Sequence, residues 1–216
     1  MWVSRFQWPS TSMSTVKSKI DSIMTNLAAH RFNAVVFQVR GQADTLYPSP
    51  YEPWSPLVSS DGSTPTGWGS FDPMEYALNA AHTRGLEFHA YINTHVAWQS
   101  GSSTPPAASN HVFHQHFNAS DPARRDWLIH DSSGQPVQYS SDGYVWIAPG
   151  VPAAQAYTRK QIMYVVQNYD VDGVHFDRAR MPSTNVSYDP ISQARRLGEG
   201  NPHNLAFADW TRDQFT

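Results

Sequence analysis

The sequence contains no cysteine, which excludes thiol catalysis, cysteine-based zinc sites and disulfide bonds. Charged residues make up only 15% of the 216 residues and the net charge is −3, so nothing indicates a surface for nucleic acid or acidic membranes. No run of 18 apolar residues predicts a transmembrane helix, and no signal peptide is recognisable. We therefore expect neither a nucleic-acid partner nor a membrane span.

Aromatic residues are abundant by comparison, at 13% of the chain with 8 Trp and 10 Tyr. Their rings suit both sugar rings and ordinary packing, so composition leaves both uses open. Hydrophobic residues make up 40% of the chain, enough for one large core. The length is near the lower limit of ~200 residues for a complete (β/α)8 barrel. We expect one domain over residues 1–216.

Predicted strands and helices alternate along the chain. The predicted strands are residues 1–6, 34–39, 86–92 and 169–178, and the predicted helices are residues 14–30, 73–84, 152–168 and 204–215. Long irregular segments follow strands, at 40–70, 93–151 and 181–202. The second is expected to contain a hairpin that pairs 127–129 with 145–147. This α/β order is typical of a (β/α)8 TIM barrel.

Four strand–helix units are half of the number that a closed barrel needs. We therefore expect the chain to hold about the N-terminal half of a (β/α)8 barrel, truncated on its C-terminal side. An open half-barrel exposes two strand edges, and we expect the apolar faces of Val35–Val39 and Val171–Phe176 to be uncovered as well. Such a chain would be catalytically incomplete. The remaining half of the barrel, or a second copy of the chain, would cover its exposed strand edges and apolar faces.

The segment Tyr169–Arg178 carries the strongest candidate for chemistry. Side chains alternate along a strand, so His175 and Asp177 share one face near its end. Barrel enzymes place their active sites at this end of the strands. We predict Asp177 as a catalytic carboxylate and His175 as a donor that keeps it ionised. The alternatives are an Asp177 that caps the next turn and a His175 that fills the barrel.

Polar side chains at the ends of two other predicted strands are candidates for substrate binding. Gln38 and Arg40 leave the second strand on one face, where they would bind sugar hydroxyls or orient Asp177. A structural salt bridge is the alternative for Arg40. Asn93 ends the third strand with an amide that suits a sugar hydroxyl, and His95 follows two residues later. The candidates for stacking on sugar rings, with core packing as their alternative, are Trp54, Trp98 and Trp146.

Four segments also resemble a known family. They are Phe32–Arg40, Leu46–Ser55, Arg84–Ala90 and Tyr169–Asp177. In this order they resemble the bacterial glycosyl-hydrolase-like family ten, a group of TIM-barrel proteins related to glycosidases, and the likeness runs from Trp2 to Thr216. It departs at Arg178-Ala179-Arg180, where the family often has another acidic residue, and at Thr94-His95, where it tends to have Pro-Tyr.

The resemblance implies hydrolysis of a glycosidic bond in an oligo- or polysaccharide, such as a bacterial cell-envelope glycan. It also leads us to expect an exported protein, and a chain that opens on a strand at Met1-Trp2-Val3 suggests that a leader has been removed. Glycosidases generally use two carboxyl groups, ~5–5.5 Å apart in retaining enzymes and ~6.5–9.5 Å apart in inverting ones. Asp177 would be the nucleophile or stabilising carboxylate, and the general acid would lie beyond Thr216. No cofactor is implied.

Two other functions fit the same residues. The first is a metal-dependent hydrolase with His175 and Asp177 as ligands. The only His-x-His pair, His114 and His116, falls in a predicted loop near His111, so we expect no metal site. The second is a non-catalytic glycan-binding barrel that keeps the aromatic residues and lacks an acid.

Overall fold

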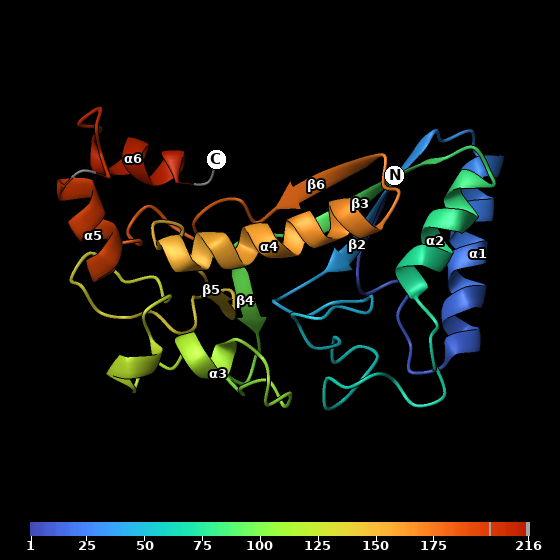
Figure 1. The fold of residues 1–216 in the computed structure, drawn as a ribbon, viewed down its shortest axis with the longest axis horizontal. Helices are drawn as coiled ribbons and strands as arrows, with labels where there is room; N and C mark the ends of the chain where they lie inside the picture. Colours follow the sequence, from blue (N-terminus) through green and yellow to red (C-terminus); the bar gives the residue numbers. More distant parts are fainter. Residues whose placement is uncertain (199, 215–216) are drawn as a thin grey trace. The chain divides into compact units, whose positions relative to one another are not determined.

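The computed structural model describes residues 1–198 and 200–214, which divide into two compact units (Figure 1). The first unit contains residues 1–93, 107–110 and 161–177, and the second contains the other described residues. Within the part of the chain that the structure describes, no helix is both long enough and apolar enough to cross a bilayer.

The first unit is built on a four-stranded parallel sheet in the order β1-β2-β3-β6. The strands are β1 (Trp2–Val3), β2 (Ala34–Arg40), β3 (Glu87–Asn93) and β6 (Gly173–Asp177). The parallel α/β sheet predicted from the sequence is confirmed. Two strands are shorter than predicted, since β1 ends at Val3 and β6 begins at Gly173.

Two neighbouring helices, α1 (Met13–Ala29) and α2 (Pro73–His82), cover one face of this sheet (Figure 1). The apolar residues at helical spacing in α1 are buried in one core with Val35, Phe37 and Val39, none of which is exposed to solvent. The expectation that the apolar face of β2 is uncovered is therefore wrong, because these side chains point toward the helices. Among the aromatic residues of the four strands, the exposed ones are on the edge strands, with Trp2 55% and Phe176 51% exposed.

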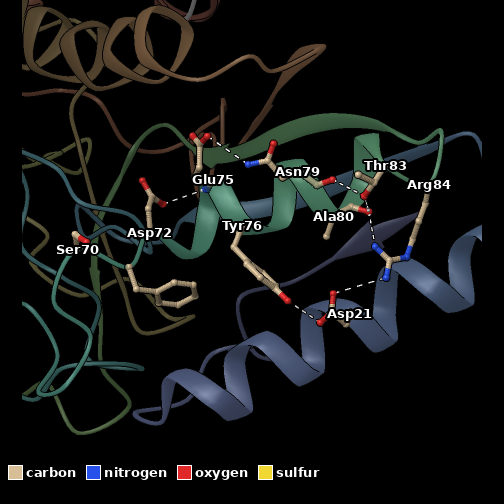
Figure 2. A pocket seen from close by; sticks show the side chains of 10 residues that line it. Asp21, Ser70, Asp72, Glu75, Tyr76, Asn79, Ala80, Thr83 and Arg84 are labelled. Atoms are coloured by element: carbon tan, nitrogen blue, oxygen red, sulfur yellow. Dashed lines mark hydrogen bonds and ion pairs between the residues drawn. The ribbon is translucent and has the colours of Figure 1, made fainter.

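The start of α2 follows the sequence signal. Asp72 Oδ1 accepts hydrogen bonds from the backbone N–H groups of Met74 and Glu75 at 2.9 and 3.1 Å, and Pro73 occupies the first helical position. A hollow of about 500 Å3 lies between α1 and α2, where Tyr76 Oη donates to Asp21 Oδ2 at 2.6 Å (Figure 2). This hollow belongs to the helical layer and not to the opposite sheet face.

The second unit contains an antiparallel pair formed by β4 (Val96–Gln99) and β5 (Tyr144–Trp146). The predicted pairing of 127–129 with 145–147 is confirmed in part, because Leu128 and Ile147 form an isolated antiparallel bridge and the Ala148 N–H donates to the Trp127 carbonyl at 2.8 Å. The partner of β5 in a regular ladder is β4, which the sequence did not predict. The backbone N–H groups of Gly134 and Gly143 donate to the carbonyls of Asp131 and Ser140 and close local turns. Such turns do not indicate which distant strands pair.

The remaining helical elements are α3 (Phe113–His116), a 3-10 turn η1 (Pro122–Arg124), α4 (Pro152–Asn168), α5 (Pro190–Leu197) and α6 (Phe207–Asp213). The predicted helices near α4 and α6 are confirmed, although Phe215 lies outside the described residues. The prediction of a loop over 181–202 is wrong, because α5 occupies its centre. Asp189 caps α5 by accepting a hydrogen bond from the backbone N–H of Ser192 at 2.8 Å.

Asp172, at the N-terminal end of β6, joins two neighbouring segments. Its Oδ2 accepts a hydrogen bond from the backbone N–H of Phe88 at 2.7 Å and lies 2.8 Å from Nε2 of His82. The Phe88 N–H, followed by His82, holds the pKa of Asp172 below its usual value. This carboxylate therefore stabilises the fold in its ionised form.

We expect Asp172→Asn to lower the free energy of unfolding by about 0.5–1 kcal/mol at pH 7, a modest value because the carboxylate is partly exposed. A depressed pKa gives stability that is present above the unfolded value of about 3.9 and is lost as pH falls through the folded value. Urea unfolding of both proteins from pH 7 down to pH 3 should show the difference shrinking. A difference that stayed constant over this range would contradict the assignment.

Candidate active site

Asp177 is the last residue of β6 and lies at the C-terminal end of the sheet. Tyr91 Oη donates a hydrogen bond to Asp177 Oδ2 at 2.5 Å. Ala90 and Ile92, the neighbours of Tyr91 along β3, are buried in the core under α1 and α2. Because side chains alternate, Tyr91 and Asp177 lie on the opposite sheet face, which in a (β/α)8 barrel is the interior.

An aromatic cluster lies beside this pair on the same face. The His175 ring packs edge-on against Trp2 and Tyr91, with ring centroids 4.3 and 5.4 Å apart. Trp2 as a whole residue is more than half exposed to solvent. Sequence reasoning gave neither Tyr91 nor Trp2 a role, because only the strand register brings them to His175 and Asp177.

Gly173 makes room for this face to pack. A Cβ atom at Gly173 would lie 2.4 Å from Nδ1 of His89, its partner in the register of β3 and β6. Glycine at this position therefore permits close packing of β6 on β3, with His89 as the neighbour that requires it.

Arg40 is fully buried and engaged with protein groups. Its Nε and Nη2 donate to the two carboxylate oxygens of Glu52 at 2.8 and 2.7 Å, and Nη1 donates to the backbone carbonyl of Asn93. The Asn93 amide donates in turn to the carbonyl of Gly41 at 2.7 Å. This geometry is that of a buried structural ion pair tying the end of β2 to β3 and to the loop after β2.

A second polar group lies at the ends of β1 and β2. Gln38 Oε1 accepts a hydrogen bond from the backbone N–H of Arg5 at 2.9 Å. Asp44 is buried, which raises the pKa of its carboxyl group, although the nearby Arg5 guanidinium partly offsets this. Sequence reasoning missed Asp44 and Glu52, because both lie in the long segment after β2 without a periodic signal.

The four remaining candidates are packed within the protein. Trp54 is 7% exposed and meets Trp68 edge to face at 5.5 Å. His95, Trp98 and Trp146 belong to the second unit and are also buried. The indole N–H groups of Trp98 and Trp146 donate to Thr104 O at 2.8 Å and Ser140 Oγ at 3.0 Å. The packing alternative fits all three tryptophans in this structure.

The histidines at 111, 114 and 116 make local contacts. His116 stacks on Trp127 at 3.8 Å and lies 2.8 Å from a carboxylate oxygen of Asp126. His114 Nε2 lies 3.0 Å from the carbonyl oxygen of Pro106. In residues 1–198 and 200–214, no group of three or more histidine, aspartate or glutamate side chains is arranged to hold a metal ion.

Comparison with known proteins identifies the family of this chain. The family model described as Glycosyl hydrolase-like 10 matches residues 1–216. The chain belongs to this family. Among curated relatives, the glycosyl hydrolase-like 10 chain is 28% identical over 222 residues to glycosyl hydrolase YngK of Bacillus subtilis, covering 99% of the chain and 39% of the relative. It is 29% identical over 187 residues to glycosyl hydrolase DigH of Escherichia coli, covering 81% of the chain and 39% of that relative.

Solved structures agree on the fold of this glycosyl hydrolase-like 10 chain. A hypothetical protein from Ruminiclostridium thermocellum superposes with a TM-score of 0.58 at 11% identity, covering 99% of this chain and 88% of the other. The maltogenic α-amylase AmyB from Thermotoga neapolitana superposes with a TM-score of 0.50 at 14% identity, covering 84% of this chain and 39% of the enzyme. The fold is therefore α/β, of the (β/α)8 barrel type, and the chain covers 39% of the length of AmyB.

Proposed function

We propose that this chain contributes Asp177 as the nucleophile or stabilising carboxylate of a glycoside hydrolase that uses two carboxyl groups. The observation that carries the proposal is the hydrogen bond from Tyr91 Oη to Asp177 at the C-terminal end of the sheet. A hydroxyl donor at this position stabilises the negative charge that the carboxylate needs when it faces an oxocarbenium-like centre. Membership of a glycosyl hydrolase-like family supports the reaction class.

The neighbours of Asp177 give the site a surface suited to a sugar. Trp2 presents an exposed ring next to His175 and Tyr91, and a flat apolar ring face can stack on the C–H face of a pyranose. Gln38, Arg40 and Asn93 would act indirectly, by fixing the strand ends from which Asp177 and Tyr91 project. The general acid would come from a later strand of the full-length protein, and the curated relatives are more than twice as long as the matched segment.

The proposed substrate is a polysaccharide of the bacterial cell envelope, and the proposed location is outside the cytoplasm. The test is to incubate the full-length protein with purified envelope glycans and with storage polysaccharides, and to identify new reducing ends by mass spectrometry. We expect shorter glycans from the envelope substrates. Binding of these glycans without any cleavage would instead support a non-catalytic glycan-binding barrel.

We expect Tyr91→Phe to lower kcat/KM by roughly 10–100-fold with little change in the melting temperature. The variant removes one hydrogen bond to a charged group, worth about 1.5–3 kcal/mol, while keeping the ring that packs on His175. Tyr164→Phe is the matched control, because the hydrogen bond from Tyr164 Oη goes to a backbone carbonyl, that of Pro48, at 3.2 Å, and not to a carboxylate. Equal activity of the two variants would contradict the role of Tyr91.

A further inference from the structure

A second hollow, of about 400 Å3, lies within the second unit between α6 and residues 179–186. Its lining includes Arg180, Met181, Phe207, Thr211 and Arg212. Ala179, also in the lining, is the second residue after Asp177, so one wall of the hollow is the segment that follows β6. This volume falls within the range of pockets that bind small molecules.

The charge of this hollow is positive. In the described part of the chain, no carboxylate lies within ion-pair distance of Arg180, whose guanidinium lies 5.5 Å above the Trp146 ring. Arg212 pairs with Asp209 of its own helix. A guanidinium group presents a planar fork of N–H donors that matches carboxylate and phosphate oxygens. The excess positive charge therefore favours an anionic group on any ligand.

Thr211 adds a hydroxyl group that the protein leaves unsatisfied. The residue is 7% exposed, it lines the hollow, and its Oγ1 has no hydrogen-bond partner among the described residues. A buried hydroxyl without a partner costs free energy, and a ligand hydroxyl that reached it after a small movement of the lining would remove that cost.

One wall of the hollow is aromatic and apolar. The Phe207 ring stacks on Tyr188 with centroids 4.1 Å apart and planes inclined by 20°, so its position is fixed by packing. Met181 also lines the hollow. A ligand that matches all of these groups has an apolar ring face, at least one hydroxyl and an anionic substituent.

We propose that this hollow is a subsite for a sugar ring that carries an anionic group, either a carboxylate or a phosphate. The inference rests on the proposed function, because it assigns the subsite to a protein that acts on glycans. Arg180 would bind the anionic group, Thr211 a ring hydroxyl, and the Phe207 wall the apolar face of the ring. Arg180, at the end of the Arg178-Ala179-Arg180 sequence, gives this subsite its charge.

The test is a titration of the full-length protein with glucuronate, glucose 6-phosphate and glucose, followed by NMR chemical-shift changes. We expect one or both anionic sugars to bind about tenfold more tightly than glucose, and the preferred one identifies the anionic group. Raising the salt concentration should reduce this preference. Equal affinity for all three sugars, or no binding of any, would overturn the proposal.

Two variants separate the roles of the lining residues. Arg180→Gln should abolish the preference for anionic sugars while leaving glucose affinity unchanged. Thr211→Val should weaken all three sugars by a similar factor without lowering the melting temperature, because it removes a hydroxyl that has no partner in the free protein. Arg124→Gln is the matched control, since this arginine is exposed on η1, outside the lining of the hollow. Unchanged selectivity in Arg180→Gln would refute the subsite.

This experiment measures binding and is independent of turnover. If Asp177→Asn keeps full activity while Arg180→Gln loses selectivity, the subsite stands and the catalytic assignment falls. If Asp177→Asn is inactive and Arg180→Gln binds all sugars as before, the catalytic assignment stands and the subsite falls.

Discussion

Replacing Asp177 by asparagine is expected to reduce turnover of an active glycan by at least about 1,000-fold, equivalent to roughly 4 kcal/mol of transition-state stabilisation. The amide is nearly the same size as the carboxylate but carries no charge, so it neither attacks the anomeric carbon efficiently nor stabilises an oxocarbenium-like centre. Tyr91 could still donate its hydrogen bond to the amide oxygen, so the fold should survive. The measurement is kcat on the same purified glycan.

Asp172→Asn is the matched control for this experiment. Asp172 lies just before β6, at the end opposite to Asp177, and it hydrogen-bonds a backbone N–H group of the sheet. The control variant should lose a little stability and keep its turnover, whereas Asp177→Asn should keep its stability and lose its turnover. Turnover near that of the unmodified protein in Asp177→Asn would remove Asp177 from the reaction.

The second large effect is expected at the buried ion pair of Arg40 and Glu52. Both side chains are completely shielded from solvent. Glu52→Gln would leave the Arg40 guanidinium buried without its countercharge, and such changes cost about 3–5 kcal/mol. Chemical unfolding should therefore show a much less stable protein, since typical domains have only about 5–15 kcal/mol of stability in total.

A double variant distinguishes a lost attraction from an uncompensated charge. Arg40→Met combined with Glu52→Leu removes both charges, and we expect it to recover most of the stability lost in Glu52→Gln. Arg124→Gln breaks an exposed pair with Asp121 at 3.4 Å, and we expect a change of no more than about 1 kcal/mol. A loss below 1 kcal/mol in Glu52→Gln would show that the buried pair does not hold β2 and its loop.

Local sequence determined the elements with strong periodic or capping signals. The helical spacing of apolar residues in α1 and the Asp72-Pro73 start of α2 each specify a helix through contacts only a few residues apart. Helix α5 begins with the same signal, Asp189-Pro190, and was still missed. Its apolar residues Ile191 and Leu197 are exposed, so the helix lacks the buried stripe that a periodicity argument detects.

The pairing of β4 with β5 depended on tertiary structure. These strands are separated by more than 40 residues, and both candidate partners of β5 are apolar segments of similar length. Local turn signals fix the ends of such segments, but the choice of partner depends on packing between segments far apart in the sequence.

In the candidate site too, some features follow from local sequence and others from tertiary structure. Strand alternation alone put His175 with Asp177 on one face of the last strand, and the amphipathic helices determined which face of the sheet is covered. The sequence could not show that Tyr91 donates to Asp177, because these residues are 86 positions apart. Their contact depends on how β3 and β6 pair. In the parallel register of these two strands, Tyr91 lies opposite His175. A shift of one residue would turn Asp177 toward the helices, so only the folded sheet decides what the carboxylate meets.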